Sequence, residues 1–221
     1  IPPNLPVKDV LSDIVNSVRE NTVTILEAPT GSGKSLLTSL ALASNKFIIH
    51  VALPTIVSAN CLFSYVTKNI NDPSIVGSAY GCIVSYNYSN KIVYMTAGHL
   101  YKRLLHIYTS MHKLPDNLVV MIDEAHHTSI DVTTLYRLCM YMVHRGFKFK
   151  IIIASATLNY TVYSGLPFRT IKCNQRLYDV DVVYNTTIID MKDTNSILNA
   201  TCEKVKEIVG TNKGILVFVP G

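Results

Sequence analysis

The stretch Ala28-Pro29-Thr30-Gly31-Ser32-Gly33-Lys34-Ser35 lies between an apolar, β-branched run at residues 23–26 and a helical pattern that begins at residue 36. A strand, a glycine-containing loop and a helix in this order are typical of a phosphate-binding loop. The glycines let the backbone turn so that its N–H groups point inward at a helix N-terminus, where they bind an anion. The lysine can then reach the β- and γ-phosphates of a nucleoside triphosphate, and the last hydroxyl can bind Mg²⁺. We therefore predict a nucleotide site formed by Thr30, Gly31, Ser32, Gly33, Lys34 and Ser35; the alternative is an ordinary glycine turn that precedes a lysine.

The composition is that of a globular chain with a modest positive charge. It has 221 residues, 48% of them hydrophobic, which fits one large domain or one domain plus part of another. The net charge of +5 is compatible with a nucleic acid partner, but no block of like charges forms a basic tail. No apolar stretch reaches the roughly 18 residues of a membrane helix, and the start lacks the features of a signal peptide.

The five cysteines are widely spaced and match no zinc pattern. We therefore expect reduced, buried thiols and a reducing compartment such as the cytoplasm. The chain starts without Met and stops at residues 219–221, just after an apolar pattern, so we expect it to be a piece of a longer protein.

Apolar runs short enough for strands alternate with helical patterns. The strand candidates are residues 23–26, 47–53, 92–95, 118–122 and 150–154, and the helix candidates are residues 7–20, 34–44, 56–67 and 133–145. Residues 74–88, rich in Gly, Ser and Tyr, predict irregular structure with short strands. Continuous apolar strands separated by helices predict an α/β fold with a parallel sheet covered on both faces. Such sheets bind nucleotides at the carboxyl ends of their strands.

A domain boundary is expected near residues 174–185. Beyond it the chain has only a helix pattern at residues 195–209 and a strand pattern at residues 214–219, too little to bury a core of its own. We interpret residues 1–180 as one domain and residues 181–221 as a linker followed by the start of a second α/β domain.

Two acids, Asp123 and Glu124, directly follow the apolar run at residues 118–122. In a parallel sheet they reach the same edge as the phosphate-binding loop. There the first carboxylate can hold Mg²⁺ and the second can polarise the attacking water. The alternative is an acidic loop that caps the next helix. His126 and His127 are a poor metal pair, because adjacent histidines point in different directions.

Ser155 and Thr157 follow the strand candidate at residues 150–154. Their hydroxyls can hydrogen-bond a neighbouring loop, and His126 is the partner we expect. Alone, the triplet Ser-Ala-Thr is more often part of a turn or a helix cap.

In this order the segments resemble the motifs of the DEAH-box family of superfamily 2 helicases. Residues 28–35 match motif I, 51–55 motif Ia, 96–100 motif Ib, 123–126 motif II, 155–158 motif III and 216–221 the start of motif IV. Residues 5–21 and 176–184 are similar to the helix before motif I and to the segment that leaves the first RecA-like domain. The resemblance thus covers nearly the whole chain, and motifs I and II are its specific part.

The resemblance implies a RecA-like P-loop NTPase domain and the start of a second RecA-like domain. It implies an NTP-dependent helicase that hydrolyses ATP or another NTP with Mg²⁺ held by Ser35 and Asp123. Motif III, with Ser155 and Thr157, would couple hydrolysis to domain movement. The catalytic residues carried over are Lys34, Asp123, Glu124 and His126.

The resemblance also implies a nucleic acid partner, single-stranded RNA in preference to DNA, on the face of motifs Ia and Ib. Phosphate contacts there come mostly from backbone amides and hydroxyls at helix N-termini. Lys102 and Arg103 could add charge, or could simply belong to a solvated helix face. The candidate nucleic acid residues are Pro54, Thr55, Thr96, Gly98 and His99, and a plain helix cap is the rival role of Thr96.

The chain departs from the family pattern in several places. Paired arginines often follow the motif Ia proline, where this chain has Thr55 and Ile56, and Glu-Arg-Ser often follows motif II, where it has residues 127–129. No glutamine motif precedes motif I, which indicates loose base selectivity. Motifs V and VI, with the arginine fingers, would lie beyond residue 221. The Asn-, Ile- and Tyr-rich composition without Trp suggests a viral member.

Two other classes of function stay open. One is a translocating or remodelling NTPase that does not separate strands, and the other is a nucleic-acid-binding scaffold with little turnover. A scaffold is expected to lose Lys34 or Glu124, and both are present.

Overall fold

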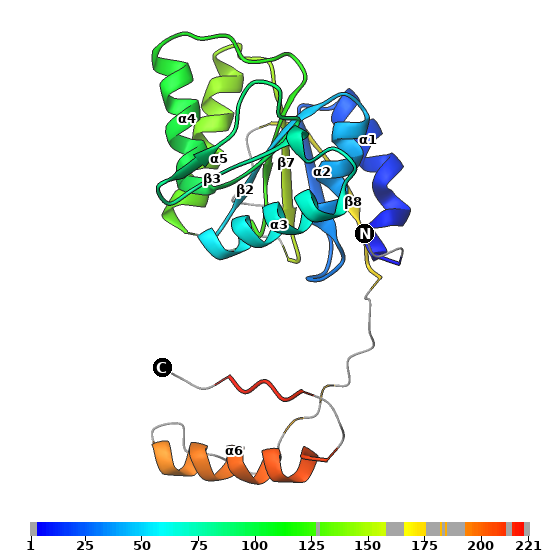
Figure 1. The fold of residues 1–221 in the computed structure, drawn as a ribbon, viewed down its shortest axis with the longest axis vertical. Coiled ribbons are helices and arrows are strands. Elements are labelled where there is room, and N and C mark those ends of the chain that lie inside the picture. Colours follow the sequence, from blue (N-terminus) through cyan, green and yellow to red (C-terminus); the bar gives the residue numbers. More distant parts are fainter. Residues whose placement is uncertain are drawn as a thin grey trace. The chain divides into compact units, whose positions relative to one another are not determined.

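A computed structural model describes residues 4–126, 129–157, 166–175, 182, 184, 193–210 and 214–218. The chain divides into two units, Ile1–Tyr178 and Asp179–Gly221. The first unit carries the sheet and the motifs up to motif III, and the second carries one described helix (Figure 1).

The first unit is built on an eight-stranded sheet with the order β4-β3-β5-β2-β6-β7-β1-β8. All described pairings are parallel except β3 with β4, so the predicted parallel sheet is confirmed. The strands are β1 Val23–Glu27, β2 Ile48–Leu53, β3 Val76–Tyr80, β4 Ile83–Ser85, β5 Ile92–Thr96, β6 Leu118–Ile122, β7 Lys150–Ser155 and β8 Phe168–Lys172.

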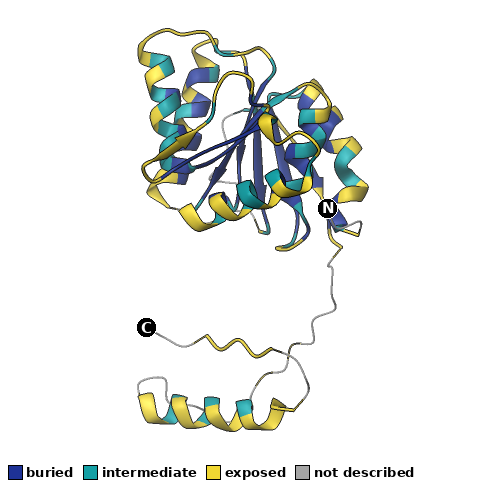
Figure 2. Ribbon diagram, viewed as in Figure 1, coloured by how far each residue is buried: buried dark blue, intermediate teal, exposed yellow. Residues whose placement is uncertain are grey.

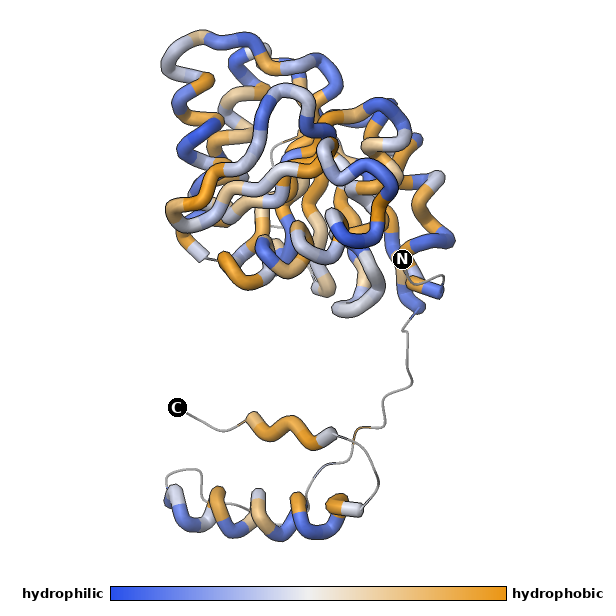
Figure 3. Tube along the Cα trace, viewed as in Figure 1, coloured by the Kyte–Doolittle hydropathy of each residue, from blue (hydrophilic) through white to orange (hydrophobic). Residues whose placement is uncertain are grey.

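Helices cover both faces of this sheet (Figure 1). One face packs against α1 (Leu11–Glu20), α2 (Lys34–Ser44) and α3 (Ile56–Asn69), and the other against α4 (Ala97–Thr109) and α5 (Ile130–His144). Short 3-10 segments at Pro6–Val10 and Pro73–Ile75 precede α1 and β3. The central strands are largely buried and mostly apolar, whereas the helices turn polar residues outward (Figures 2 and 3).

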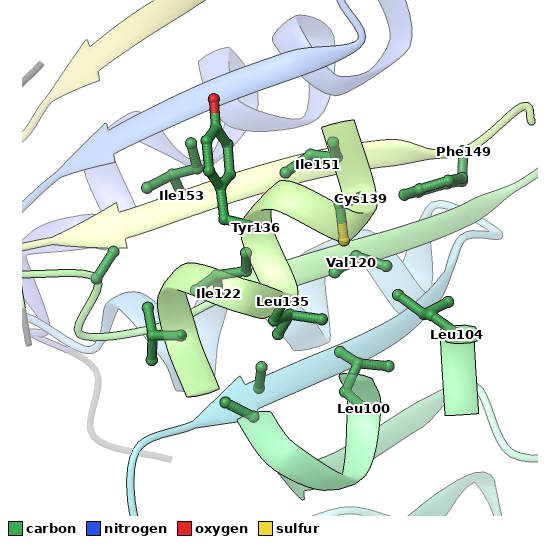
Figure 4. Close-up of a cluster of buried hydrophobic side chains, with 14 of the residues drawn as sticks. Leu100, Leu104, Val120, Ile122, Leu135, Tyr136, Cys139, Phe149, Ile151 and Ile153 are labelled. Carbon is green, nitrogen blue, oxygen red and sulfur yellow. The ribbon is translucent and has the colours of Figure 1, made fainter. Parts of the chain in front are cut away.

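The core under α4 and α5 shows why the strands carry unbroken apolar runs. Leu100 and Leu104 of α4 and Leu135 of α5 are fully buried against alternate residues of β6 and β7 (Figure 4). The intervening residues of the same strands, such as Val119 and Ile152, fill the core on the opposite face. Burial on both faces therefore fixes these strands at the centre of the sheet.

Most helices and strands begin and end within three residues of the predicted bounds, but three segments differ from the prediction in their type of structure. Residues 7–20 form a 3-10 turn and then α1, because Pro6 starts the segment and Lys8 N–H donates to the Leu5 carbonyl. β8 was not predicted. The predicted strand at residues 214–219 is absent from the described residues 214–218, because a strand needs a pairing partner and none is described beside it.

The second unit has α6 (Thr194–Ile208), which the Asp193 side chain caps by accepting from Asn195 N–H at 3.0 Å. The helix pattern predicted at residues 195–209 is therefore present. None of its described residues is buried, which agrees with a segment too short to form its own core.

The cysteines correct one expectation. All five are free, but only Cys139 and Cys173 are buried, while Cys61, Cys82 and Cys202 are exposed.

Among the described helices, none combines the length and the apolar character that a membrane span requires.

Candidate NTP and nucleic acid site

Five strand ends in one row place the predicted motifs along the carboxyl edge of the sheet. In the order β5, β2, β6, β7 and β1, these strands lead into Ala97, Pro54, Asp123, Ala156 and Ala28. Neighbouring strands lie about 4.8 Å apart, so motif Ib and the phosphate-binding loop are roughly 19 Å apart along this edge. The candidate nucleic acid residues and the candidate NTP residues therefore occupy opposite ends of one continuous edge.

The loop between β1 and α2 has the backbone that a phosphate cradle needs. Gly31 and Gly33 adopt φ values of +80° and +84°, which residues with a Cβ rarely accept. The Ala28 N–H donates to the Ser155 carbonyl at 2.9 Å, and Ser32 accepts from Val7 N–H at 3.1 Å. The loop is thus fastened to β7 on one side and to the N-terminal segment on the other, with α2 starting directly at Lys34.

Lys34 and Glu124 meet across 90 residues of sequence. The ammonium Nζ donates to the Glu124 Oε1 at 2.7 Å. The Lys34 side chain is 4% exposed and that of Glu124 is 22% exposed, so the lysine is buried while the carboxylate keeps contact with solvent. A buried ammonium requires an anionic partner, and the pair therefore marks the place where a phosphate group can compete for Lys34.

Beside this pair, Ser35 donates a hydrogen bond from its hydroxyl to the Asp123 carboxylate. Asp123 is buried, and this burial raises its carboxyl pKa to about 6, against the opposing influence of the Lys34 charge and the Ser35 hydrogen bond. The Glu124 charge raises the pKa further. A carboxylate held in this way is unfavourable on its own and gains from a nearby cation.

The backbone at Glu124 is strained in a way that the sequence does not reveal. Its φ is +50°, a left-handed value that is uncommon for a residue other than glycine. The Glu124 N–H donates to Asp123 Oδ1 at 2.9 Å, and the Asp123 N–H donates to the Ala52 carbonyl at 2.9 Å. Such strain clusters at functional sites, and here it turns the Glu124 side chain toward Lys34.

The predicted contact between motifs II and III is present. His126 Nδ1 lies 3.1 Å from Ser155 Oγ and 3.3 Å from Glu124 Oε2. Ser155 Oγ in turn donates to the Thr157 carbonyl at 2.6 Å, and Thr157 N–H donates back at 3.3 Å. The Thr157 side chain is not part of these bonds. A connected path therefore runs from the acidic pair to the end of β7.

The donor set fits Mg²⁺. The Ser35 hydroxyl and the Asp123 carboxylate are the hard oxygen ligands that this ion prefers, and it is usually completed by substrate phosphates and water. Among the described residues, no cluster of three or more His, Cys, Asp or Glu side chains forms a metal cage.

A hollow of about 500 Å³ opens over the loop and identifies residues that sequence reasoning missed. Leu5, Cys61 and Tyr65 line it together with Gly33 and Glu124. Leu5 Cδ1 lies only 2.7 Å from where a Cβ on Gly33 would stand, so glycine is required there for space as well as for backbone conformation. Leu5 lies before Pro6 in an irregular segment, and no periodicity could have identified it.

The two candidate threonines at helix N-termini differ in their bonding. Thr55 caps α3: its hydroxyl accepts from Ser58 N–H at 3.0 Å, and its own N–H donates to Ser58 Oγ. Thr96 occupies the same position before α4 but makes no side-chain capping bond among the described residues. The register pairs Leu53 with Thr96, so both threonines lie near the ends of neighbouring strands at the same edge of the sheet.

The remaining candidates lie at the start of α4. His99 Nε2 lies 2.8 Å from the Gly81 carbonyl, which ties α4 to the turn after β3. A Cβ on Gly98 would lie 3.2 Å from Asp131, so this glycine permits a close approach of α5. Lys102 is exposed, whereas Arg103 turns away and donates to the Tyr86 hydroxyl, so only Lys102 remains available as a charge on this face.

Some predicted segments lie outside the described residues. These are residues 127 and 128 after motif II, Leu158 of motif III, most of residues 176–184 and the end of the motif IV pattern.

Comparison with known proteins identifies the family. The family model described as DEAD/DEAH box helicase matches residues 9–164. The ATP-dependent RNA helicase HrpA of Borreliella burgdorferi is 26% identical over 93% of this chain and 25% of its own length, and that of Escherichia coli is 29% identical over 100% and 17%. A putative ATP-dependent RNA helicase of Saccharomyces cerevisiae is 30% identical over 70% of this chain. The chain spans a quarter or less of these relatives.

The fold agrees with a solved helicase structure. The crystal structure of the Escherichia coli DEAH/RHA helicase HrpB superposes with a TM-score of 0.76 over 92% of this chain and 27% of that one, at 22% identity. The RecA-like fold predicted from the motif resemblance is confirmed. The relatives reported are bacterial and eukaryotic, and a viral origin stays a prediction. With a family model that covers most of the first unit and the Asp-Glu-Ala-His sequence at the strand end, the chain belongs to the DEAD/DEAH box helicase family.

Proposed function

We propose that this chain is the NTP-hydrolysing part of an RNA helicase. The observation that carries the proposal is the meeting of Lys34 with Glu124 and of Ser35 with Asp123 at one edge of the sheet. These four groups supply a phosphate-binding cation, two oxygen ligands and a carboxylate that can orient water. The relatives named as ATP-dependent RNA helicases support ATP as the nucleotide and RNA in preference to DNA.

In this proposal the loop at residues 30–35 binds the triphosphate through its backbone N–H groups. Lys34 leaves Glu124 and pairs with the β- and γ-phosphates, and Ser35 and Asp123 hold Mg²⁺. A Mg²⁺ ion held by these two residues would supply positive charge to offset the charge that develops on the phosphate oxygens. Glu124, released from Lys34, orients the attacking water. The exchange of partners by Lys34 thus links nucleotide binding to the freeing of the catalytic carboxylate.

His126 and Ser155 carry the coupling in this proposal. Their contact joins the segment that holds the acidic pair to the end of β7, and the Ser155 carbonyl also accepts from the phosphate-binding loop. In this proposal, a displacement of Glu124 passes through His126 to residues 155–157 at the end of β7. Pro54, Thr55, Thr96, Gly98 and His99 form the proposed RNA face.

We further propose the domain division stated above, with residues 1–180 as the first RecA-like domain and residues 181–221 as linker and start of the second. The relatives' greater length supports further domains. The cysteines, all free, support a reducing compartment.

The test is an assay of ATP hydrolysis and strand displacement in the protein extended through its second domain, on RNA and DNA duplexes. Lys34→Ala should lower both activities by orders of magnitude, because the phosphates lose their ammonium partner. Lys68→Ala, which removes an exposed lysine at the end of α3, is the matched control and should change neither.

Near-normal hydrolysis by Lys34→Ala would overturn the proposed site. Hydrolysis that is stimulated by nucleic acid without strand displacement would instead identify a translocating NTPase.

A further inference from the structure

A second cavity, of about 440 Å³, lies in the first unit away from the phosphate-binding loop. Its wall includes the first half of β2, the segment before β5, the last turns of α4 and the loop that leads to β6. These parts belong to the amino edge of the sheet. The cavity is therefore separated from the candidate NTP site by the length of a strand, on the order of 15–20 Å.

Two buried nitrogens at this cavity have no hydrogen-bond partner. His50 is 6% exposed, and its Nδ1 is unpartnered within the described part of the chain, as is Nε of Arg103. Burial and, secondly, the Arg103 charge lower the His50 pKa to about 3, so this imidazole is neutral and offers both a donor and an acceptor. Buried polar groups in native proteins nearly always have a hydrogen-bond partner, so these two nitrogens are available to a ligand or to a water molecule in the cavity.

The same cavity carries an aromatic and cationic wall. The Arg103 guanidinium carbon lies 4.6 Å from the centre of the Tyr86 ring and is held there by a bond to its hydroxyl. Tyr88 is fully exposed at 101%, so its ring face is open for stacking. Lys113 adds a second positive charge, and none of the described residues lining the cavity is acidic. This combination attracts an anion that carries a flat ring.

We propose that this cavity is a second nucleotide-binding site, independent of the phosphate-binding loop. Arg103 and Lys113 pair with the phosphate, Tyr88 stacks on the base, and His50 hydrogen-bonds the ligand at the cavity floor. The volume lies within the range of small-molecule pockets. The occupant is either a free mononucleotide or the terminal nucleotide of an RNA strand, which share this chemistry. The inference does not depend on NTP hydrolysis, since no residue is shared with the candidate NTP site.

The experiment follows the ring-nitrogen NMR signals of His50 in this chain, assigned by comparison with His50→Gln. Three probes are titrated without Mg²⁺: uridine 5′-monophosphate, inorganic phosphate, and a short single-stranded oligouridylate with a 5′ phosphate. We expect saturable shifts of the His50 signals with the mononucleotide, the oligonucleotide or both, and only weak effects with phosphate. Saturation by the mononucleotide identifies a free nucleotide, and saturation by the oligonucleotide alone identifies a strand end.

Two variants test the stacking and charge assignments. Tyr88→Ala removes the stacking ring and Lys113→Ala removes a positive charge that pairs with the phosphate, and both side chains are exposed. Each change should weaken binding about tenfold or more, which for Tyr88 is the contribution expected from base stacking on an aromatic ring. Lys68→Ala, on the far side of the sheet, is the matched control and should leave binding unchanged. The proposal is overturned if no probe shifts the His50 signals, if phosphate binds as tightly as the mononucleotide, or if Tyr88→Ala binds like the wild type.

Discussion

The Asp123 carboxylate is buried, which is an unfavourable environment for its negative charge. It is 3% exposed, and desolvation dominates the other influences on its pKa, including the favourable Lys34 charge and Ser35 hydrogen bond. The carboxyl group is therefore easier to protonate in the folded chain than in the unfolded one. A site that holds such a group ready for a cation gives up stability when the cation is absent.

Asp123→Asn should accordingly stabilise the chain without Mg²⁺ and nucleotide at neutral pH. The pKa of the Asp123 carboxyl in the folded chain, about 6, lies above its ordinary value of 3.8. In the wild type, protonation of Asp123 therefore favours the folded chain: this contribution to the unfolding free energy is fully present below about pH 4 and is lost as the pH rises through about 6. The variant should exceed the wild type at pH 7.5 by on the order of 1–3 kcal/mol in unfolding free energy, and the gap should close near pH 4.

Urea unfolding at the two pH values measures this difference. A variant less stable than the wild type at pH 7.5 would show that the Asp123 charge is well compensated in the folded state, contrary to this account.

At the level of single residues, the sequence predicted the candidate site correctly where the site depends on residue type and spacing. The motif pattern predicted that Lys34 and the acids at residues 123 and 124 share one edge, and the structure brings them together. The left-handed backbone of Glu124 and the packing of Leu5 over Gly33 were not readable. Both follow from tertiary packing, which local sequence does not encode.

Among the elements, α3 and α4 follow neighbouring strands and both start at the carboxyl edge of the sheet with a threonine at the N-cap, but the two threonines bond differently. The Thr55 hydroxyl forms a reciprocal capping box with Ser58, whereas Thr96 makes no side-chain capping bond among the described residues. A hydroxyl already bonded within its own helix is less available to a phosphate than one that is not.

Thr55→Ala and Thr96→Ala should therefore separate stability from RNA binding. Thr55→Ala should lower the unfolding free energy by about 1 kcal/mol, the usual contribution of an N-cap, while Thr96→Ala should change it little. In RNA titrations at constant salt, Thr96→Ala should show the larger loss of affinity. If Thr96→Ala costs as much stability as Thr55→Ala and leaves RNA affinity unchanged, Thr96 is a structural cap only.

Sequence reasoning missed β8 and predicted β3 only as a short strand without bounds within residues 74–88, because both have weak patterns. β8 buries only Ile171 among its five residues and has no alternation to detect. β3, Val-Gly-Ser-Ala-Tyr, is fully buried but consists mostly of residues with low strand propensity. By contrast, α2 and β6 match the predicted ranges 34–44 and 118–122, because a glycine loop and an acidic pair delimit them.

At the scale of the first unit, the row of strand ends brings two sets of candidate residues to one edge of the sheet. The NTP candidates after β1 and β6 and the RNA candidates after β2 and β5 are held by the same parallel sheet. The first unit therefore carries both sets of candidate residues, whereas the family resemblance assigns the arginine fingers to motifs V and VI, which are not among the motifs matched in residues 1–221.

The 221-residue chain alone should consequently hydrolyse ATP slowly and respond little to RNA. Arginine fingers contribute roughly 10³–10⁵ in rate, and extension through the second domain should recover a large part of that factor. Steady-state ATP turnover of the chain and of the extended protein, with and without RNA, measures this. Robust RNA-stimulated turnover by the chain alone would favour an NTPase complete within one domain.

The measurement that bears most directly on the account is the pair of ATP affinity and ATP turnover in Glu124→Gln of the extended protein. The amide keeps the shape of the side chain but removes the carboxylate that orients water, and it frees Lys34 from its ion pair. We predict that ATP binds at least as tightly as to the wild type while turnover falls by orders of magnitude. Loss of binding together with turnover, or unchanged turnover, would contradict the assignment of Glu124 as the catalytic carboxylate.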